Sequence, residues 1–137
     1  MKPEYTQNTE ENKQLRRRLL DAYLGKTVHI EIDRPIGYIH KKETYTLTYP
    51  INYGFVPHVF GGDGEELDVY LLGVQTPVKE YTDVIIAAAI RADDAEDKLV
   101  MAPCGMSFTA KEIEEQIHFQ EKYYKTTIML AKEAEQL

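Results

Sequence analysis

The sequence predicts a mainly β domain of the α+β class, in which several short strands lie between an N-terminal helix and a C-terminal helix. The chain has 137 residues, of which 43% are hydrophobic, and this is enough apolar material to bury one core. Alternation of apolar and polar residues is found in the middle of the chain, whereas helical spacing occurs near its two ends. Strands gathered in this way favour a barrel over alternating βαβ units. We therefore expect a small OB-like β-barrel, closed or partly open, with the two helices flanking it.

The first expected element is an amphipathic helix over about residues 8–24. Leu15, Leu20 and Leu24 fall on one stripe of this helix, and Gly25 is a typical stop signal. The run of three arginines from 16 to 18 is expected to form a solvated face of the helix.

Five strands are expected to follow this helix. In the segment 28–32, Val28 and Ile30 alternate with His29 and Glu31, as in a strand with one buried face. The other expected strands span residues 44–49, 68–72, 84–91 and 98–102.

A second helix is expected near the end of the chain, over residues 109–135. Thr109 and Glu112 have the spacing of a capping box, and Ile113, Ile117 and Ile128 keep helical spacing beyond it. The expected organisation is a single domain over residues 1–137. It has a helical extension at 1–25, a barrel at 28–103 and this helix at 109–135.

Composition also limits the kinds of partner that the protein can have. Sixteen basic and twenty-three acidic residues give a net charge of −7, which argues against binding nucleic acid or an anionic membrane. The N-terminal residues are polar, and the sequence has no run of roughly 20 apolar residues. A cytoplasmic location is therefore expected. Ten tyrosines and apolar strand faces favour a homo-oligomer.

A glycine-rich acidic loop is the first candidate site. Glycines at 61, 62 and 64 predict a tight turn, and Asp63, Glu65 and Asp68 place carboxylates on it. Oxygen ligands of this kind suit Mg²⁺, which commonly acts beside substrate phosphates. The spacing does not fit a calcium EF-hand loop, because Asp68 would stand where that loop needs glycine. Taken alone, the loop is explained equally well as a solvated turn rich in Asp and Gly.

A second segment, just before the loop, favours the metal site over the solvated turn. Tyr49-Pro50-Ile51-Asn52-Tyr53-Gly54 lies upstream of Gly62-Asp63-Gly64-Glu65-Glu66-Leu67-Asp68-Val69. The pair resembles the YPxNYG segment and the D-x-D-x-x-D signature of family I inorganic pyrophosphatases, in the same order and at similar spacing. The resemblance covers roughly residues 28–125. It implies hydrolysis of inorganic diphosphate to two phosphates by a water molecule activated by Mg²⁺, with Mn²⁺ as an alternative ion.

The resemblance also implies roles for individual residues. Glu65 is expected to take the proton of the attacking water, and the other expected catalytic residues are Asp63, Asp68 and Tyr53. The expected phosphate-binding residues are Lys41, Lys98, Tyr124 and Lys125. The expected metal ligands are Glu31, Asp63, Glu65, Asp68, Asp93 and Asp97, with Asp94 an alternative to Asp93 and Glu96 an alternative to Asp97.

Two departures from the family pattern are visible in the sequence. The middle acid of the signature is Glu65 rather than Asp, and a displacement of about 1 Å can cost on the order of a hundredfold in rate. Between Ile32 and Tyr49 the chain is too short for the family's strand pair with its additional lysine and glutamate, a place that Arg34 or Lys42 could fill. The alternative function is a catalytically weak module of the same fold, which binds a phosphorylated small molecule or a protein partner.

Overall fold

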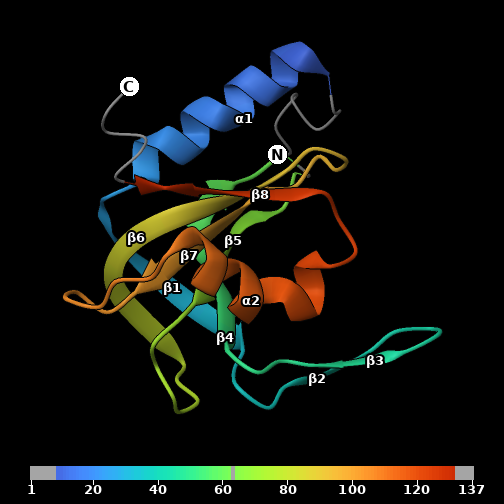
Figure 1. Ribbon diagram of the computed structural model, residues 1–137, viewed down its shortest axis with the longest axis vertical. Helices are drawn as coiled ribbons and strands as arrows, with labels where there is room; N and C mark the ends of the chain where they lie inside the picture. Colours follow the sequence, from blue (N-terminus) through green and yellow to red (C-terminus); the bar gives the residue numbers. More distant parts are fainter. Residues whose placement is uncertain (1–8, 63, 132–137) are drawn as a thin grey trace.

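The computed structural model describes residues 9–62 and 64–131 (Figure 1). Its elements, in chain order, are α1 (Glu10–Tyr23), β1 (Thr27–Arg34), β2 (Ile39–Lys41), β3 (Thr46–Thr48), β4 (Asn52–Phe60), β5 (Glu66–Leu71), β6 (Glu80–Arg91), β7 (Lys98–Ala102), α2 (Ala110–Glu121) and β8 (Thr126–Leu130). Within the described ranges, neither helix is long and apolar enough to cross a membrane.

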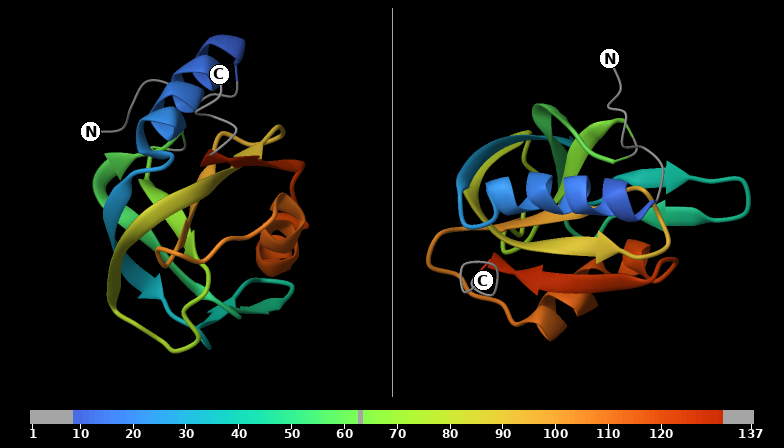
Figure 2. Two further views of the ribbon diagram at one scale, coloured as in Figure 1. Left: turned by 60° about the vertical axis from the view of Figure 1, so that its left-hand side comes forward. Right: turned by 90° about the horizontal axis from the view of Figure 1, so that it is seen from above.

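Five of the strands close into a barrel. The large sheet has the order β1-β4-β5-β7-β6-β8, and a further pairing of β1 with β6 joins its two sides. β8 lies outside this ring and pairs with β6 alone. Figure 2 shows that α1 lies across one end of the barrel and that α2 lies along the side of the barrel. The predicted mainly β barrel with two flanking helices is therefore confirmed.

Alternation along the strands divides the buried side chains into two clusters. Val69 and Leu71 of β5 belong to the cluster that includes Leu20 of α1. Tyr70, which lies between them, belongs to the cluster that includes Ile113 of α2. Because neighbouring residues of a strand point to opposite faces, one short strand serves both the barrel interior and the layer beneath α2.

The pairing of β1 with β4 requires glycine at position 54. A Cβ atom on Gly54 would lie 1.8 Å from the carbonyl oxygen of Glu31, a distance at which no side chain fits. The last residue of the YPINYG segment therefore allows the two strands to approach closely.

The N-terminal helix begins and ends within two residues of the predicted bounds. The Thr9 side chain caps α1 by accepting a hydrogen bond from the backbone N–H of Asn12 at 3.2 Å. Leu20 and Leu24 are buried, as the apolar stripe predicts. The prediction of a solvated arginine run is wrong for Arg16, which is 2% exposed. Its guanidinium is buried against Asp97, a partner 81 residues away that helical periodicity does not show.

The C-terminal helix is shorter than the predicted span of 109–135. The capping box at Thr109 and Glu112 forms, but α2 ends at Glu121, and Thr126–Leu130 is the strand β8. The edge of β6 offers unpaired peptide groups that β8 satisfies, and the segment begins with the β-branched run Thr126-Thr127-Ile128. This sheet edge is formed far away in the sequence, so the helical spacing of Ile128 was misleading. Residues 132–135 of the predicted helix lie outside the described residues.

A small hairpin extends from the barrel (Figure 1). β2 pairs with β3 in a separate two-stranded sheet, in which His40 is opposite Leu47. The predicted strand at 44–49 corresponds to β3, whereas β2 and the long strand β4 were not predicted. Tyr45 of the hairpin stacks on Tyr123 after α2, with 5.3 Å between the ring centroids.

Candidate active site

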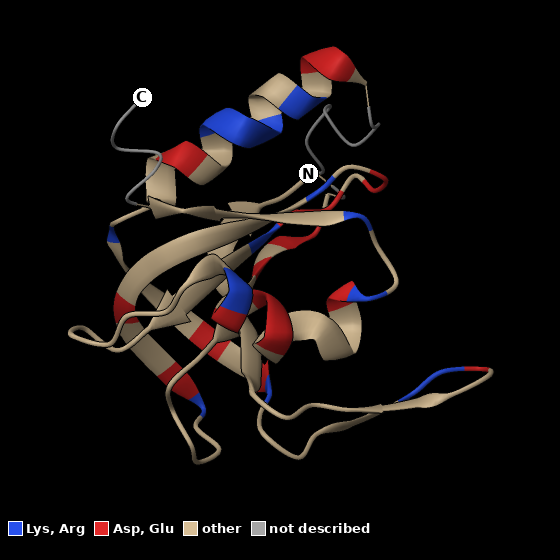
Figure 3. Cartoon of the chain, in the orientation of Figure 1, with Lys and Arg blue, Asp and Glu red and all other residues tan. Residues whose placement is uncertain are grey.

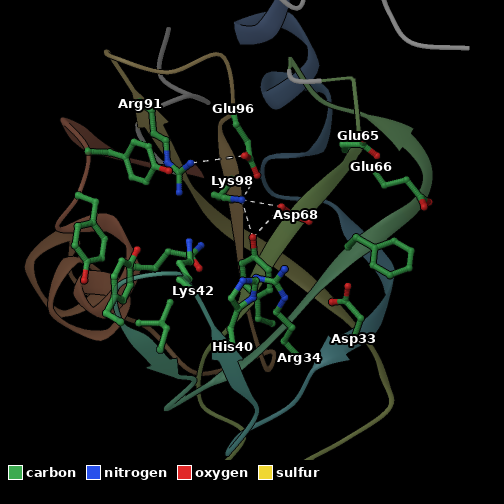
Figure 4. A pocket seen from close by; sticks show the side chains of 17 residues that line it. Asp33, Arg34, His40, Lys42, Glu65, Glu66, Asp68, Arg91, Glu96 and Lys98 are labelled. Carbon is green, nitrogen blue, oxygen red and sulfur yellow. Dashed lines mark hydrogen bonds and ion pairs between the residues drawn. The ribbon is translucent and has the colours of Figure 1, made fainter.

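A cavity of about 480 Å³ lies where the strands β4, β5 and β7 meet the hairpin and the end of α2. Figure 4 shows the side chains around it. Most of those that carry charge come from strand ends and the turns beside them, where a rigid sheet holds residues that are distant in sequence close together.

Lys98 forms the centre of the cavity wall. Its Nζ donates hydrogen bonds to the Tyr53 hydroxyl at 2.6 Å and to Asp68 Oδ2 at 2.7 Å, and it also contacts Glu96 Oε1. The Tyr53 hydroxyl in turn donates to Asp68 Oδ2 at 2.8 Å. β5 lies between β4 and β7 in the sheet, so Asp68 is positioned between the strands that carry Tyr53 and Lys98.

The charges of this group depend on one another. Burial by itself lowers the pKa of Lys98, but the charges of Asp68 and Glu96 outweigh burial and raise this pKa, so the ammonium stays protonated. Burial favours the neutral form of Asp68, and Lys98 outweighs it and holds the pKa of Asp68 below its ordinary value. The pKa of Glu96 is raised, first by burial and then by the adjacent Asp68 carboxylate. When the pair takes up one proton, that proton therefore resides on Glu96.

Arg91, at the end of β6, is a cavity residue that the sequence reasoning missed. Its Nε and Nη2 donate to the two carboxylate oxygens of Glu121 at 2.9 and 2.6 Å, and Nη1 donates to Asp94 at 3.0 Å. The Tyr124 ring covers the guanidinium, with 3.7 Å between Cζ and the ring centroid. An arginine that ends the apolar run of β6 directly before an acidic turn was the signal that could have identified it.

The acids at 93–97 do not all face the cavity. Glu96 lines it, whereas Asp93 and Asp97 are not among its lining residues. Asp97 is 4% exposed, binds the Arg16 guanidinium through both carboxylate oxygens, and accepts the backbone N–H of Arg91 at 3.0 Å. Asp93 accepts the backbone N–H of Lys125 at 2.9 Å. Of the acids considered for this segment, Glu96 is the one in position to act with Asp68.

The first acidic loop brings Glu65 and Asp68 to the cavity, together with Glu66. Asp63 lies outside the described residues. On β1, Asp33 lines the cavity, whereas Glu31, two residues earlier, is exposed and does not.

The expected phosphate-binding residues divide in a similar way. Lys98 and Tyr124 line the cavity, but Lys41 and Lys125 are exposed and do not. Lys42 lines the cavity instead, together with His40. Alternation along the hairpin strand explains this difference, since residues 40 and 42 share a face and residue 41 points to the other. Arg34, which like Lys42 could take the place of the family's additional lysine, also lines the cavity.

The donor set of the cavity suits a hard cation only in part. Five carboxylates line it, from Asp33, Glu65, Glu66, Asp68 and Glu96, against four fixed cations, from Arg34, Lys42, Arg91 and Lys98. A polyanionic ligand would need further positive charge in such a place, which a divalent ion supplies. Among residues 9–62 and 64–131, however, no three His, Cys, Asp or Glu side chains converge as a metal-binding group. Ligation by the described residues would begin from Asp68 and Glu96, which Lys98 holds together.

The protein is thus a small β-barrel that carries carboxylates, lysines and arginines on the outer face of β4, β5 and β7, beside α2. A family model described as inorganic pyrophosphatase matches residues 21–128. This match covers more than half of the chain, and the chain therefore belongs to the inorganic pyrophosphatase family.

Individual relatives agree with this assignment. The curated inorganic pyrophosphatase of Mesorhizobium japonicum is 28% identical over an alignment of 85 residues, gaps included, which covers 58% of this chain and 48% of the relative. That of Agrobacterium fabrum is 33% identical over 85 residues, with the same two shares. The chain thus spans about half the length of the curated relatives it matches.

Solved structures show the same fold. The crystal structure of inorganic pyrophosphatase from Ehrlichia chaffeensis aligns with a TM-score of 0.61 at 18% identity, covering 82% of this chain and 91% of that one. The inorganic pyrophosphatase from Coxiella burnetii aligns with a TM-score of 0.58 at 18% identity, with the same coverage. At this identity the likeness concerns the fold.

Proposed function

We propose that the protein hydrolyses inorganic diphosphate to two phosphates in the cavity around Lys98. The observation that carries the proposal is the group formed by Tyr53 of β4, Asp68 of β5, Lys98 of β7 and Glu96 of the turn before β7, which meet in one cavity. Membership of the inorganic pyrophosphatase family supports the same reaction.

In the proposed reaction a water molecule attacks one phosphorus atom and the bond from that phosphorus to the bridging oxygen breaks. Glu65 takes the proton of the water, as a general base of the cavity wall. Arg34, Lys42 and Arg91 neutralise the phosphate oxygens, with Lys98 ordering the acids between them. The Tyr53 hydroxyl is hydrogen-bonded to Asp68 and Lys98, so these two charged groups keep their positions as the leaving phosphate departs.

We further propose Mg²⁺ as the cofactor, with Mn²⁺ as a substitute. Among the described residues, Asp68 and Glu96 would be its first ligands, and Asp63 is the further ligand that the family resemblance implies. When bound, the ion lowers the pKa of a bound water and neutralises substrate charge. Ion binding can be tested without turnover. Titration of the wild-type protein with Mg²⁺ should give a heat of binding beyond the heat of dilution, and Asp68→Asn should reduce this heat of binding.

The proposal is tested by measuring phosphate release from diphosphate with and without Mg²⁺. We expect turnover in the wild-type protein, and a loss of roughly a hundredfold or more in kcat for Glu65→Gln and for Asp68→Asn. Glu114→Gln, on the exposed surface of α2 away from the cavity lining, is the matched control and should retain full activity. Turnover that survives both cavity substitutions would contradict the proposed site.

A second candidate function is a module that binds a phosphorylated small molecule or a protein partner without efficient turnover. The observation that favours it is that no three acids of the described residues converge to hold a metal ion, because the proposed turnover depends on such an ion. Tight binding of the non-hydrolysable analogue imidodiphosphate, with no phosphate release from diphosphate, would support this candidate and contradict the hydrolase.

We also propose that the protein is cytoplasmic and forms a homo-oligomer that binds neither nucleic acid nor membranes. The net charge of −7 supports the last two points, and sedimentation of the purified protein tests the oligomer.

A further inference from the structure

Arg16 connects the N-terminal helix to the acidic turn that follows β6. Its Nε and Nη2 donate to the two oxygens of Asp97 at 3.0 and 2.9 Å, and Nη2 also approaches the carbonyl oxygen of Arg91 at 3.5 Å. Both side chains of this ion pair are buried, with 2% and 5% of their surface exposed. In Figure 3 the basic segment of α1 lies above the acidic turn between β6 and β7.

The same side chain lies against the other acidic loop. A Cβ atom on Gly62 would stand 2.7 Å from Cδ of Arg16 and 2.0 Å from the carbonyl oxygen of Ala95. Only glycine therefore fits between the arginine and the turn that carries Ala95. Gly62 of the first acidic loop, the 93–97 turn and α1 thus meet at the Arg16 side chain.

Each of these two turns supplies an acid to the candidate active site. Glu65 lies three residues after Gly62, and Glu96 directly follows Ala95. A second cavity, of about 270 Å³, lies between α1 and the end of β6, and Arg91 lines both this cavity and the active-site cavity. Arg16 therefore stands directly behind the wall on which Glu65 and Glu96 are placed.

We propose that Arg16 is a positioning residue, which holds the 60–65 and 93–97 turns together so that Glu65 and Glu96 face one cavity. The effect of Arg16 on the reaction rate rests on the proposed function, whereas its effect on the order of the two turns does not. Arg16 precedes the range 21–128 matched by the family model, so the proposed contribution comes from the part of α1 that lies outside that range.

The effect of Arg16 on the positions of the turns can be separated from its effect on the free energy of unfolding. A buried ion pair is often no more stabilising than neutral groups of similar volume, so both charges can be removed together. In Arg16→Met/Asp97→Asn, both charges are removed while position 97 keeps an acceptor for the Arg91 N–H. Arg16→Lys keeps the charge but loses the two-point geometry with Asp97. Arg18→Met changes an exposed neighbour on the same helix and is the control.

The test compares these variants in the full chain by circular dichroism, hydrogen exchange and turnover of diphosphate. We expect all three to fold, and we expect exchange of the backbone amides at 60–65 and 93–97 to rise at least tenfold in the double variant and in Arg16→Lys, while β5 and β7 remain protected. In the same two variants kcat should fall about tenfold to a hundredfold with less than threefold change in KM, since displaced acids act on the reaction step. Arg18→Met should match the wild type throughout.

Two results would overturn the inference. One is a folded double variant in which both turns stay as protected as in the wild type. The other is a loss of protection spread evenly over the barrel, which would make Arg16 a general stabilising residue. If the wild-type protein does not hydrolyse diphosphate, the proposed function fails, and the exchange data alone still decide whether Arg16 orders the turns.

Discussion

At the scale of the residue, the buried side chain of Asn52 shows why the YPINYG segment has an amide. Its Oδ1 accepts the backbone N–H groups of Ile36 and Val78 at 3.1 and 3.4 Å, and its Nδ2 donates to the carbonyl oxygens of Val74 and Thr76 at 3.4 and 3.0 Å. Asn52→Leu would leave buried peptide groups unpaired, so we expect the free energy of unfolding to fall by about 2–4 kcal/mol. Urea unfolding measures this loss.

Gln75, on the loop between Val74 and Thr76, provides the control. It is exposed, and Gln75→Ala should change the free energy of unfolding by less than about 0.5 kcal/mol. If Asn52→Leu were as mild as Gln75→Ala, the amide would not be joining these loops.

A second residue-scale prediction concerns the two adjacent lysines of the hairpin. Lys42 lines the cavity and Lys41 does not, although the resemblance pointed to Lys41. We expect Lys42→Met to raise the KM for diphosphate about tenfold, the effect of one lost charged contact to a phosphate, and Lys41→Met to leave it within twofold. Steady-state kinetics of the two variants show which lysine contacts the substrate. Equal effects on KM would contradict the placement of Lys42 alone in the cavity wall.

At the scale of the element, α2 is joined to the barrel by the ion pair of Glu121 with Arg91. Burial by itself would raise the pKa of Glu121, but the hydrogen bonds and charge of Arg91 outweigh it and hold this pKa below its ordinary value. The ionised carboxylate therefore stabilises the fold above the pKa of the unfolded chain, about 4.3, and this contribution is lost as the pH falls through the lower pKa of the folded state.

Glu121→Gln tests this dependence. It removes one partner of a buried pair, so we expect a loss of about 3 kcal/mol in the free energy of unfolding at pH 7. The difference from the wild type should shrink as the pH is lowered from about 5 toward 3, because the wild-type carboxylate becomes protonated there as well. Urea unfolding at several pH values measures the difference, and a difference independent of pH would contradict the assignment.

At the scale of the whole molecule, the two buried clusters share the strands β5, β6 and β7. Neither cluster can be lost without removing packing from the other, so we expect one cooperative unfolding transition, as for a single domain. Calorimetry should give equal calorimetric and van't Hoff enthalpies when the van't Hoff analysis includes the subunit number found by sedimentation. A separate early transition for α2 and β8 would contradict this prediction.

Local patterns were sufficient for much of the fold and for part of the site. The capping box at Thr109, the apolar stripe of α1 and the alternating strands are properties of neighbouring residues, so they could be read in order along the chain. The acidic loop was visible in its glycines and carboxylates, and Tyr53 was identified through the resemblance. The structure brings Glu65, Asp68 and Tyr53 to one cavity with Lys98. β8 could not be predicted in this way, because a segment with helical spacing became a strand on the edge of β6.

Periodicity and motifs of neighbouring residues were enough to predict the class of fold, the family and the acidic loop. Contacts between segments that are distant in the chain determine instead which charges face the cavity. Arg91, Asp33 and Lys42 entered it, whereas Asp97 turned to Arg16 of the first helix. A buried charge needs a partner, and the fold determines that partner by bringing distant strands and helices together.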